Sequence, residues 1–361
     1  MADERLGSLR RAKLKALVRD GRLGGTLPEG AVDGALPGGA AMRSADSARG
    51  WVLVDDGAVA GLGAALAWSV RERLPRAGLE VLVETAPARS ASRPGDGPRV
   101  DAAAVVARRA AEFAPAPTVW AVAGTELRPI VAGDAVAAGE PELPPGDLDR
   151  FAAELARHGA DPIVEHGVLR GEVLGLEVAR AVPETNGGWR LAAGVGRHDR
   201  DAREQLRPDQ PPGDALDEVV ALVRQWRRPG GLRHPANTLS RERWLRSLLV
   251  AAPERVGARS LAPLPVPVPT TDLRDATPAA ALGTSASTGG PLVVVCSVGV
   301  DLDLVPTAAD VRLLHAPDAE LLVVLPEGDD LPVTRTLAAA LARPAQVLAV
   351  PRDWQAALAA E

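Results

Sequence analysis

Three glutamates and one histidine in the middle of the chain are the side chains best suited to acid–base or metal chemistry. Glu165, Glu172 and Glu177 occur in a β-rich stretch, and His198 follows the next turn. Strict strand alternation would place Glu177 among small residues, where a carboxylate without a partner is costly. Glu177 must therefore either pair with a cation or bind a metal ion.

The sequence leaves both alternatives open. In the first, the glutamates form ion pairs with arginines that are close in sequence, namely Arg170, Arg180, Arg190 and Arg197. His198 then lies in solvent. In the second, the three glutamates are ligands of a divalent cation such as Mg²⁺, and His198 acts as a general base near neutral pH.

The second alternative rests on a resemblance. The segment Gly171-Glu172-Val173-Leu174-Gly175-Leu176-Glu177-Val178-Ala179 falls in a predicted meander of three strands between helices. This arrangement resembles the core of PD-(D/E)xK nucleases. The resemblance implies a nuclease-like fold and metal-dependent hydrolysis of phosphodiesters by clustered carboxylates. In that family a lysine follows the second acid by two residues, and Ala179 stands at that position here.

The scarcity of lysine excludes several kinds of catalysis. Lysine occurs only at Lys13 and Lys15, tyrosine is absent, and the single cysteine, Cys296, lies in an apolar run. A P-loop or Schiff-base lysine is therefore excluded beyond residue 15. One cysteine allows no disulfide within the chain, and Cys296 is predicted to be a small buried residue. Arginine in place of lysine, with abundant Ala, Gly and Pro, resembles a high-GC, actinobacterial-type bacterial protein family.

A basic segment with interleaved tryptophans follows the acidic stretch. Arginine beside aromatic rings suits phosphate contact and base stacking. We therefore predict an anion- or nucleic-acid-binding surface made of Arg224, Arg227, Arg228, Arg241, Arg243, Arg246, Trp226 and Trp244, in a chain whose net charge is −6. The alternative is a solvated helical face on which arginine stems cover the tryptophan rings.

Two shorter motifs suggest other ligands. Gly61-x-Gly63 at the start of a predicted helix, with Glu84 at the end of the next strand, resembles a dinucleotide-binding fingerprint that lacks its third glycine. Asp301 and Asp303 follow an apolar strand and could bind Mg²⁺. A polar cap on the following helix is the simpler explanation of the two aspartates.

Strands and helices alternate at both ends of the chain. Strands are predicted at 51–54, 79–83, 119–122, 292–297, 321–325 and 347–350, with helices between them. This order is typical of parallel sheets with crossover helices. The first two strands are similarly spaced in both regions, as an internal repeat would be, although βαβ units generally have that length. The stretch between the two regions contains a predicted hairpin at Asn186-Gly187.

We therefore predict an α/β chain with two βαβαβ-type parallel-sheet modules that flank an α+β middle module with a β-meander. The expected parts are a flexible N-terminal arm at 1–49, modules at 50–135, 148–250 and 291–361, and a Pro/Gly-rich linker at 261–290.

The composition is that of a globular protein, with 46% hydrophobic and 24% charged residues. The start of the chain is charged and has no apolar signal-peptide core, and no stretch resembles a membrane span, so we expect a cytoplasmic protein. The expected role is non-catalytic binding or assembly through the Arg/Trp surface, with a nucleic-acid or protein partner and no cofactor. The alternatives are a metal-dependent phosphodiester hydrolase and a nucleotide-binding α/β enzyme.

Overall fold

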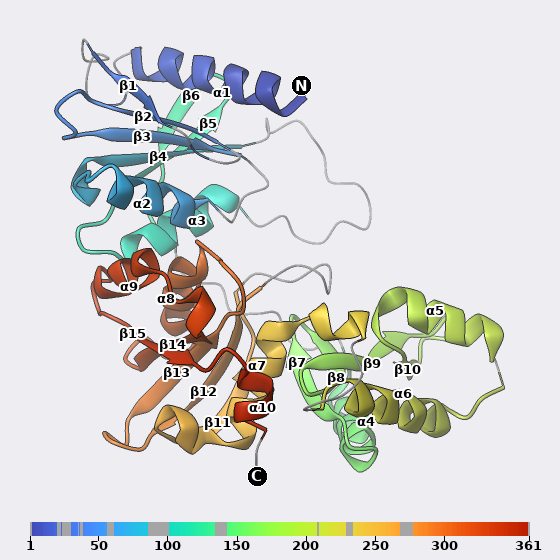
Figure 1. Cartoon of the computed structure of the whole chain (residues 1–361). Helices are drawn as coiled ribbons and strands as arrows, with labels where there is room; N and C mark the ends of the chain where they lie inside the picture. The colour runs from blue at the N-terminus through green and yellow to red at the C-terminus, as the bar shows by residue number, and fades with distance from the viewer. Residues whose placement is uncertain are drawn as a thin grey trace. The chain divides into compact units, whose positions relative to one another are not determined.

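The computed structural model describes residues 2–19, 23, 30–34, 36, 39–55, 61–85, 101–133, 143–207, 209–228, 234–267 and 277–359. The chain divides into two compact units (Figure 1). The first contains Met1–Ala135, Leu302–Asp310 and Leu331–Ala345, and the second contains Val136–Asp301, Val311–Asp330 and Gln346–Glu361. Helices and three sheets in the described residues confirm the α/β class.

The first unit is built on a six-stranded sheet in the order β1-β2-β3-β4-β5-β6. The elements are α1 (Ala2–Arg19), β1 (Val32–Gly34), β2 (Ala40–Arg43), β3 (Gly50–Val54), α2 (Leu62–Arg71), the 3-10 helix η1 (Arg76–Gly78), β4 (Leu79–Glu84), α3 (Ala102–Ala111), β5 (Thr118–Ala123) and β6 (Glu126–Pro129). Strands β3, β4 and β5 are parallel, and the other neighbours pair antiparallel. The prediction of parallel strands joined by crossover helices is thus confirmed for the central strands.

The predicted flexible arm at 1–49 is wrong for its helix and strands. Helix α1 buries Leu14, Leu17 and Val18 in a core cluster with residues of β2 and β3. These side chains recur at the spacing of one helical face, which gives α1 an apolar stripe. Much of the Gly/Pro-rich stretch, including Gly38, lies outside the described residues.

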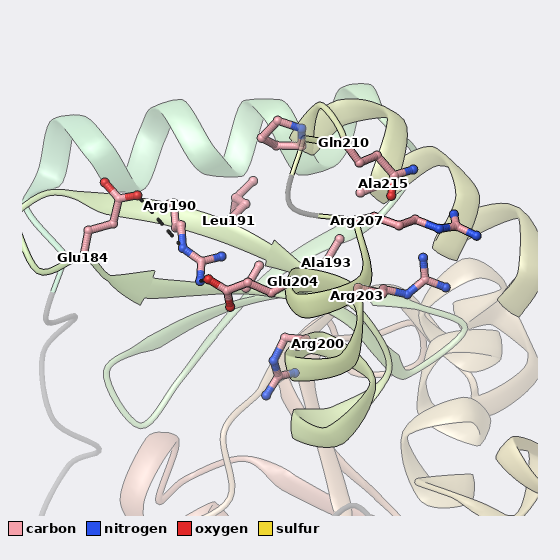
Figure 2. Close-up of a pocket in the computed structure, with 12 residues that line it drawn as sticks. Glu184, Arg190, Leu191, Ala193, Arg200, Arg203, Glu204, Arg207, Gln210 and Ala215 are labelled. Carbon is pink, nitrogen blue, oxygen red and sulfur yellow. Dashed lines mark hydrogen bonds and ion pairs between the residues drawn. The ribbon is translucent and has the colours of Figure 1, made fainter.

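The middle of the chain forms a four-stranded antiparallel meander in the order β10-β9-β8-β7. Its elements are α4 (Pro145–Arg157), β7 (Asp161–Glu165), β8 (Val168–Val173), β9 (Leu176–Pro183), β10 (Trp189–Ala193), α5 (Gly196–Leu206) and α6 (Pro212–Trp226). Helices α4 and α6 each begin at a Pro-Pro-Gly-Asp sequence, where proline fits the first turn and aspartate favours the helix N-terminus. Figure 2 shows α5 beside β10. The expected hairpin at Asn186-Gly187 is confirmed by the pairing of β9 with β10.

Tight turns join the first three strands of the meander. His166-Gly167 connects β7 to β8 and Leu174-Gly175 connects β8 to β9, and all four residues have positive φ between 48° and 78°. Two positive-φ residues between antiparallel strands form the turn that matches the twist of a hairpin. The second turn packs closely on the next helix, because a Cβ at Gly175 would lie 2.2 Å from the backbone carbonyl carbon of Arg243.

The C-terminal part forms a five-stranded sheet in the order β11-β12-β13-β14-β15. Its elements are η2 (Pro235–Thr238), α7 (Arg241–Ala251), η3 (Pro253–Val256), β11 (Ala258–Leu264), β12 (Ala279–Ser285), β13 (Pro291–Cys296), α8 (Leu304–His315), β14 (Glu320–Pro326), η4 (Glu327–Asp329), α9 (Pro332–Ala339), β15 (Gln346–Val350) and α10 (Trp354–Ala357). Strands β13, β14 and β15 are parallel, whereas β11 and β12 pair antiparallel.

The predicted linker at 261–290 is therefore wrong where it overlaps β11 and β12. Pro263 is part of β11, opposite Ala281 of β12. Strand β11 is at the end of its sheet, and an edge strand tolerates a proline whose missing N–H would face away from the ladder. Residues 268–276 of the predicted linker lie outside the described residues.

The six- and five-stranded sheets repeat one topology. Each runs helix, two antiparallel strands, then βαβαβ, from α1 to β5 and from α7 to β15. Equivalent positions meet within the first unit, after α3 and α9. The N–H of Ala114 donates to the carbonyl of Ala340 (3.1 Å), and the N–H of Ala342 donates to the carbonyl of Glu112 (2.8 Å). Each of the two segments donates one of these hydrogen bonds and accepts the other. Such reciprocal hydrogen bonds form when the same segment of two copies of a motif is in contact.

We expect Gly175→Ala to lower the free energy of unfolding by about 2–5 kcal/mol, because it adds a steric clash with α7 to the cost of positive φ. Gly187→Ala is the matched control. Gly187 has φ +84° but no atom within 4 Å of an added Cβ, so only about 1–2 kcal/mol should be lost. Chemical denaturation followed by tryptophan fluorescence measures both variants. Equal losses would show that the turn does not need close contact with α7.

Candidate functional site

A β-bulge places Glu177 beside its cation. Gly171 pairs with Ala179 but Glu172 pairs with Glu177, so Val178 is an extra residue in β9. A bulge shifts the alternation by one residue, and Glu177 and Arg180 come to the same side of the strand. Arg180 donates two hydrogen bonds to Glu177, Nε to Oε1 (3.0 Å) and Nη2 to Oε2 (2.9 Å). Arg200 of α5 donates to Oε1 as well (2.6 Å).

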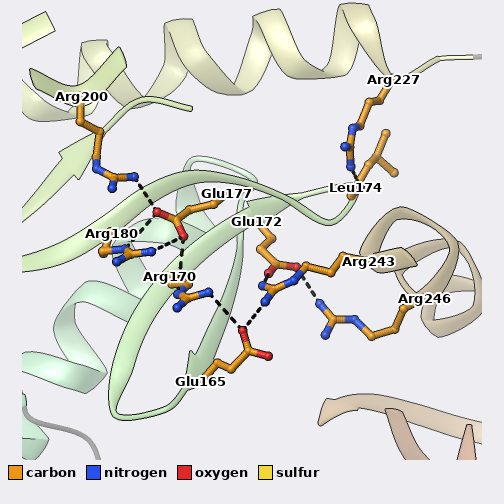
Figure 3. Close-up of polar contacts among 10 residues, drawn as sticks. All are labelled: Glu165, Arg170, Glu172, Leu174, Glu177, Arg180, Arg200, Arg227, Arg243 and Arg246. Atoms are coloured by element: carbon orange, nitrogen blue, oxygen red, sulfur yellow. Dashed lines mark hydrogen bonds and ion pairs between the residues drawn. The ribbon is translucent and has the colours of Figure 1, made fainter. Parts of the chain in front are cut away.

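The other two glutamates bind arginines of α7 (Figure 3). Arg243 donates through Nη1 to Glu172 Oε1 (2.6 Å) and through Nη2 to Glu165 Oε2. Arg246 donates to the second oxygen of Glu172 (2.7 Å). Arg170 of β8 joins the two groups, since its Nη1 donates to Glu165 (3.1 Å) and its Nε lies 3.5 Å from Glu177. We call these side chains, Glu165, Glu172, Glu177, Arg170, Arg180, Arg200, Arg243 and Arg246, the central ion-pair network.

The network keeps its carboxylates ionised although they are buried. Burial by itself would raise the pKa of Glu172, but the guanidiniums of Arg246 and Arg243 outweigh it and hold the pKa below the ordinary value. Glu177 behaves in the same way: burial opposes ionisation, and the hydrogen bonds and charge of Arg180 lower its pKa. The two glutamates are cross-strand neighbours, a like-charge pair that is unfavourable unless cations neutralise it.

The carboxylates singled out in the sequence are thus brought together by arginines. The expected pairing with Arg170 and Arg180 is observed, whereas Arg190 pairs with Glu204 (2.7 Å) and Arg197 with Asp201 (3.6 Å). Within the described ranges, no three His, Cys, Asp or Glu side chains are arranged to hold a metal ion. His198 is exposed in the first turn of α5. Sequence reasoning missed Arg200, Arg243 and Arg246 as partners, because their contacts cross between elements.

The Arg/Trp segment requires a correction. The prediction treated it as one exposed surface, but Arg227, Arg243, Arg246 and Trp244 are buried. Arg224 and Arg228 are exposed, while Arg241 and Trp226 are half-buried. The physical reason is that buried carboxylates on β7 and β8 need cations, and α7 supplies them. Trp226 is also engaged, because its ring stacks on His234 at 3.8 Å.

Arg227 is buried and forms no ion pair with a carboxylate of the described residues. It donates to the carbonyls of Leu174 (2.6 Å) and Leu239, and its guanidinium lies over the Trp244 ring, 4.9 Å from the centroid. Burial lowers the pKa of Arg227 to about 9. Its contacts tie the Leu174-Gly175 turn to the segment that precedes α7, so this arginine also has a structural role.

Gly63 of the first short motif and Asp303 of the second are found together in the first unit. The N–H of Gly63 donates to the carboxylate of Asp303 (2.9 Å), and a Cβ at Gly63 would lie 1.9 Å from the carbonyl oxygen of Leu302. Burial raises the pKa of Asp303. The helix N-terminus that a pyrophosphate would use is thus occupied by a protein carboxylate. Glu84 forms an ion pair with Lys13. In addition, β3, β4 and β5 follow one another in sequence order without a switch point.

An open arginine-lined pocket of about 340 Å³ lies between β10, α5 and the start of α6. Arg190, Leu191 and Ala193 come from β10, and Arg200, Arg203 and Glu204 come from α5 (Figure 2). We call this the arginine pocket, and its lining also includes Glu184, Ala192, Arg207, Gln210, Pro212 and Ala215. Arg200, Arg203 and Arg207 recur at intervals of three and four residues, which indicates one helical face, so the sequence contained a signal for this site.

Comparison with known proteins gives no match among protein families, curated proteins or solved structures. Of the helices in the described part of the chain, none has both the length and the apolar character needed to cross a membrane.

We expect Glu172→Gln to reduce the free energy of unfolding by about 3–5 kcal/mol, because it removes the carboxylate that Arg246 binds and leaves the buried Arg243 with Glu165 alone. Glu204→Gln is the matched control. The Glu204 side chain is 61% exposed and pairs with Arg190, so the loss should stay below about 1 kcal/mol. Urea denaturation of the two variants tests the difference. A Glu172→Gln protein as stable as the control would show that the network does not hold the fold.

The network also predicts an acid-sensitive fold. Because the pKa of Glu172 is lower in the folded chain than its ordinary value of 4.5, the unfolded chain binds the proton more readily. The resulting stabilisation is fully present above pH 4.5 and is lost as the pH falls through the folded-state value. The free energy of unfolding should therefore decrease more steeply below pH 4.5 in the wild type than in Glu172→Gln. Parallel curves for the two proteins would contradict the assigned pKa direction.

Proposed function

We propose that this chain is a non-catalytic binding protein that holds an acidic segment of a protein partner in the arginine pocket. The observation that carries the proposal is the convergence of four arginines, from β10, α5 and the residue directly after α5, on one open cavity of about 340 Å³. Guanidinium groups form paired hydrogen bonds with carboxylates in a planar geometry, which suits recognition of aspartate and glutamate side chains.

The arginines of the pocket retain hydrogen-bonding capacity. Arg190 donates to Glu204 (2.7 Å), Arg207 donates to Glu218 (2.7 Å), and Arg203 binds Asp199 through Nε (3.1 Å). Each guanidinium has five N–H donors, and these contacts use a minority of them. The pairs formed by Arg190 and Arg207 are exposed, and exposed pairs contribute about 0–1 kcal/mol, so a partner carboxylate could replace them at low cost.

The lining favours a protein segment over nucleic acid. None of the residues that line the pocket is aromatic, so the site offers no ring on which a base could stack. Glu184 and Glu204 are also part of the lining and would repel a continuous phosphate backbone. A segment with spaced carboxylates can avoid both glutamates.

A non-catalytic role is supported by the central ion-pair network. The three carboxylates that could have formed a reaction centre are buried and bound to guanidiniums. The charge of each is neutralised by arginines of the same chain. These acids therefore support the fold that carries the arginine pocket.

We expect a fluorescent Asp/Glu-rich peptide to bind the wild-type chain, and its Asn/Gln analogue to bind at least tenfold more weakly. Arg203→Ala with Arg207→Ala should weaken binding of the acidic peptide about tenfold or more, since hydrogen bonds to charged groups contribute about 1.5–3 kcal/mol. Fluorescence anisotropy at two salt concentrations measures the affinities.

Arg197→Ala is the matched control for the double variant. Arg197 belongs to the same helix, its side chain is 86% exposed, and it does not line the pocket, so affinity should change less than about twofold. An equal loss of affinity in the control and in the double variant would show that the peptide responds to general surface charge and not to the arginine pocket. Tighter binding of single-stranded DNA than of the peptide would overturn the proposed partner class.

A further inference from the structure

The arginine pocket runs along an edge strand that no other strand covers in the described structure. Strand β10 is at the end of its sheet and pairs only with β9. Four of its residues, Arg190, Leu191, Ala192 and Ala193, line the pocket. The backbone of an edge strand presents N–H and C=O groups that can pair with another chain.

The hydrogen bonds at both ends of β10 show which backbone groups are turned outward. The N–H of Glu184 donates to the carbonyl of Gly188 (2.8 Å), and the N–H of Gly194 donates to the carbonyl of Val178 (2.8 Å). The register between these bonds is unbroken, and hydrogen-bonded positions alternate in an antiparallel pair. Leu191 and Ala193 therefore direct their backbone groups away from β9.

Strand β7 forms the opposite edge of the same sheet and is less able to pair with an added strand. The two-residue turn after Glu165 makes Glu165 and Val168 a hydrogen-bonded pair, so Pro162 and Val164 of β7 are the outward positions. Pro162 has no N–H to offer an added strand. Strand β10 contains no proline, and only this edge of the meander keeps both of its central outward donors.

Helix α5 forms the other side of the groove and is held mainly by ion pairs. None of its residues is buried, and it is linked to the sheet through Arg200 to Glu177 and Glu204 to Arg190. It follows β10 through Gly194 and Gly196, which have φ of +146° and +72°. Because the helix has no buried residue, its contact with β10 depends, apart from the bond of Arg200 to Glu177, on partly exposed ion pairs.

We infer, on the basis of the proposed function, that the acidic segment binds as a fifth strand paired with the outer edge of β10. Backbone hydrogen bonds to Leu191 and Ala193 would provide the pairing, and side chains at alternate positions would face the arginines of β10 and α5. Strand addition supplies affinity through the main chain, while the arginines select for carboxylates. The partner is therefore an extended acidic polypeptide rather than a helix or a free anion.

The test uses N-methylated forms of the acidic peptide with the intact chain. Methylation at every second residue removes the N–H groups of one edge of the peptide and leaves its charge unchanged. Of two peptides methylated in opposite phases, one should lose binding at least tenfold and the other should stay within about threefold of the parent. If both bind like the parent peptide, strand addition is wrong while the proposed function stands. If the parent peptide itself does not bind, the proposed function fails.

Ala193→Pro provides the corresponding change in the protein. It removes an outward N–H without removing a bond to β9, so the fold should persist and affinity for the acidic peptide should fall at least fivefold. Circular dichroism and urea denaturation verify that the variant is folded. A folded Ala193→Pro protein with wild-type affinity would overturn the inference. If the variant does not fold, the peptide pair alone decides.

Discussion

The second unit depends on one constraint, which is that carboxylates buried in the meander must be neutralised. Glu172 and Glu177 face each other across β8 and β9, and neither is exposed to water that could stabilise its charge. The guanidiniums that compensate them come from three places: the meander itself, α5 and α7. The same contacts that satisfy the charges therefore fix how the meander meets α7. Removing either partner leaves an uncompensated buried charge, which is among the more destabilising changes available to a protein.

This division of arginines explains where binding capacity remains. Arg243 and Arg246 of α7 pair with interior carboxylates, and Arg227 is held by backbone carbonyls and the Trp244 ring. Arg190 of β10 and Arg207, directly after α5, pair at the surface, where ion pairs exchange readily. Charge that is accessible to a partner is therefore found along β10, next to backbone groups that have no strand to pair with. The arginines of the pocket and the unpaired edge of β10 lie next to each other, and this combination favours recognition of an extended acidic segment.

The two copies of the repeated topology differ in their first helix, and only α7 contacts the meander through arginines. In both copies the first helix covers the sheet with leucine-rich positions at the same spacing, Leu14, Leu17 and Val18 in α1 and Leu245, Leu248 and Leu249 in α7. With these positions aligned, Arg243 of α7 corresponds to Ala12 of α1, and Arg246 corresponds to Lys15. Lys15 pairs with Asp33 close in sequence, whereas Arg243 and Arg246 reach the acids of β7 and β8. The change from alanine to arginine distinguishes the helix that anchors the meander from the one that does not.

The sequence alone determined the α/β class, the outer crossover units and a middle meander with its hairpin at Asn186-Gly187, because these depend on local periodicity and short-range contacts. It also offered the pairing of glutamates with Arg170 and Arg180 as one of two alternatives, which is observed for Glu165 and Glu177. The sequence could not predict the bulge at Val178, because one extra residue in a strand does not change the composition of the segment. The extra residue nevertheless changes which side chains lie on the same face of the strand. The sequence also could not assign Arg243 and Arg246 to the interior, because arginine is usually exposed and only the tertiary structure places the acids of β7 and β8 against α7. Burial and partner choice are decided by contacts between segments far apart in the chain, and the spacing of charges along one segment contains no information about them.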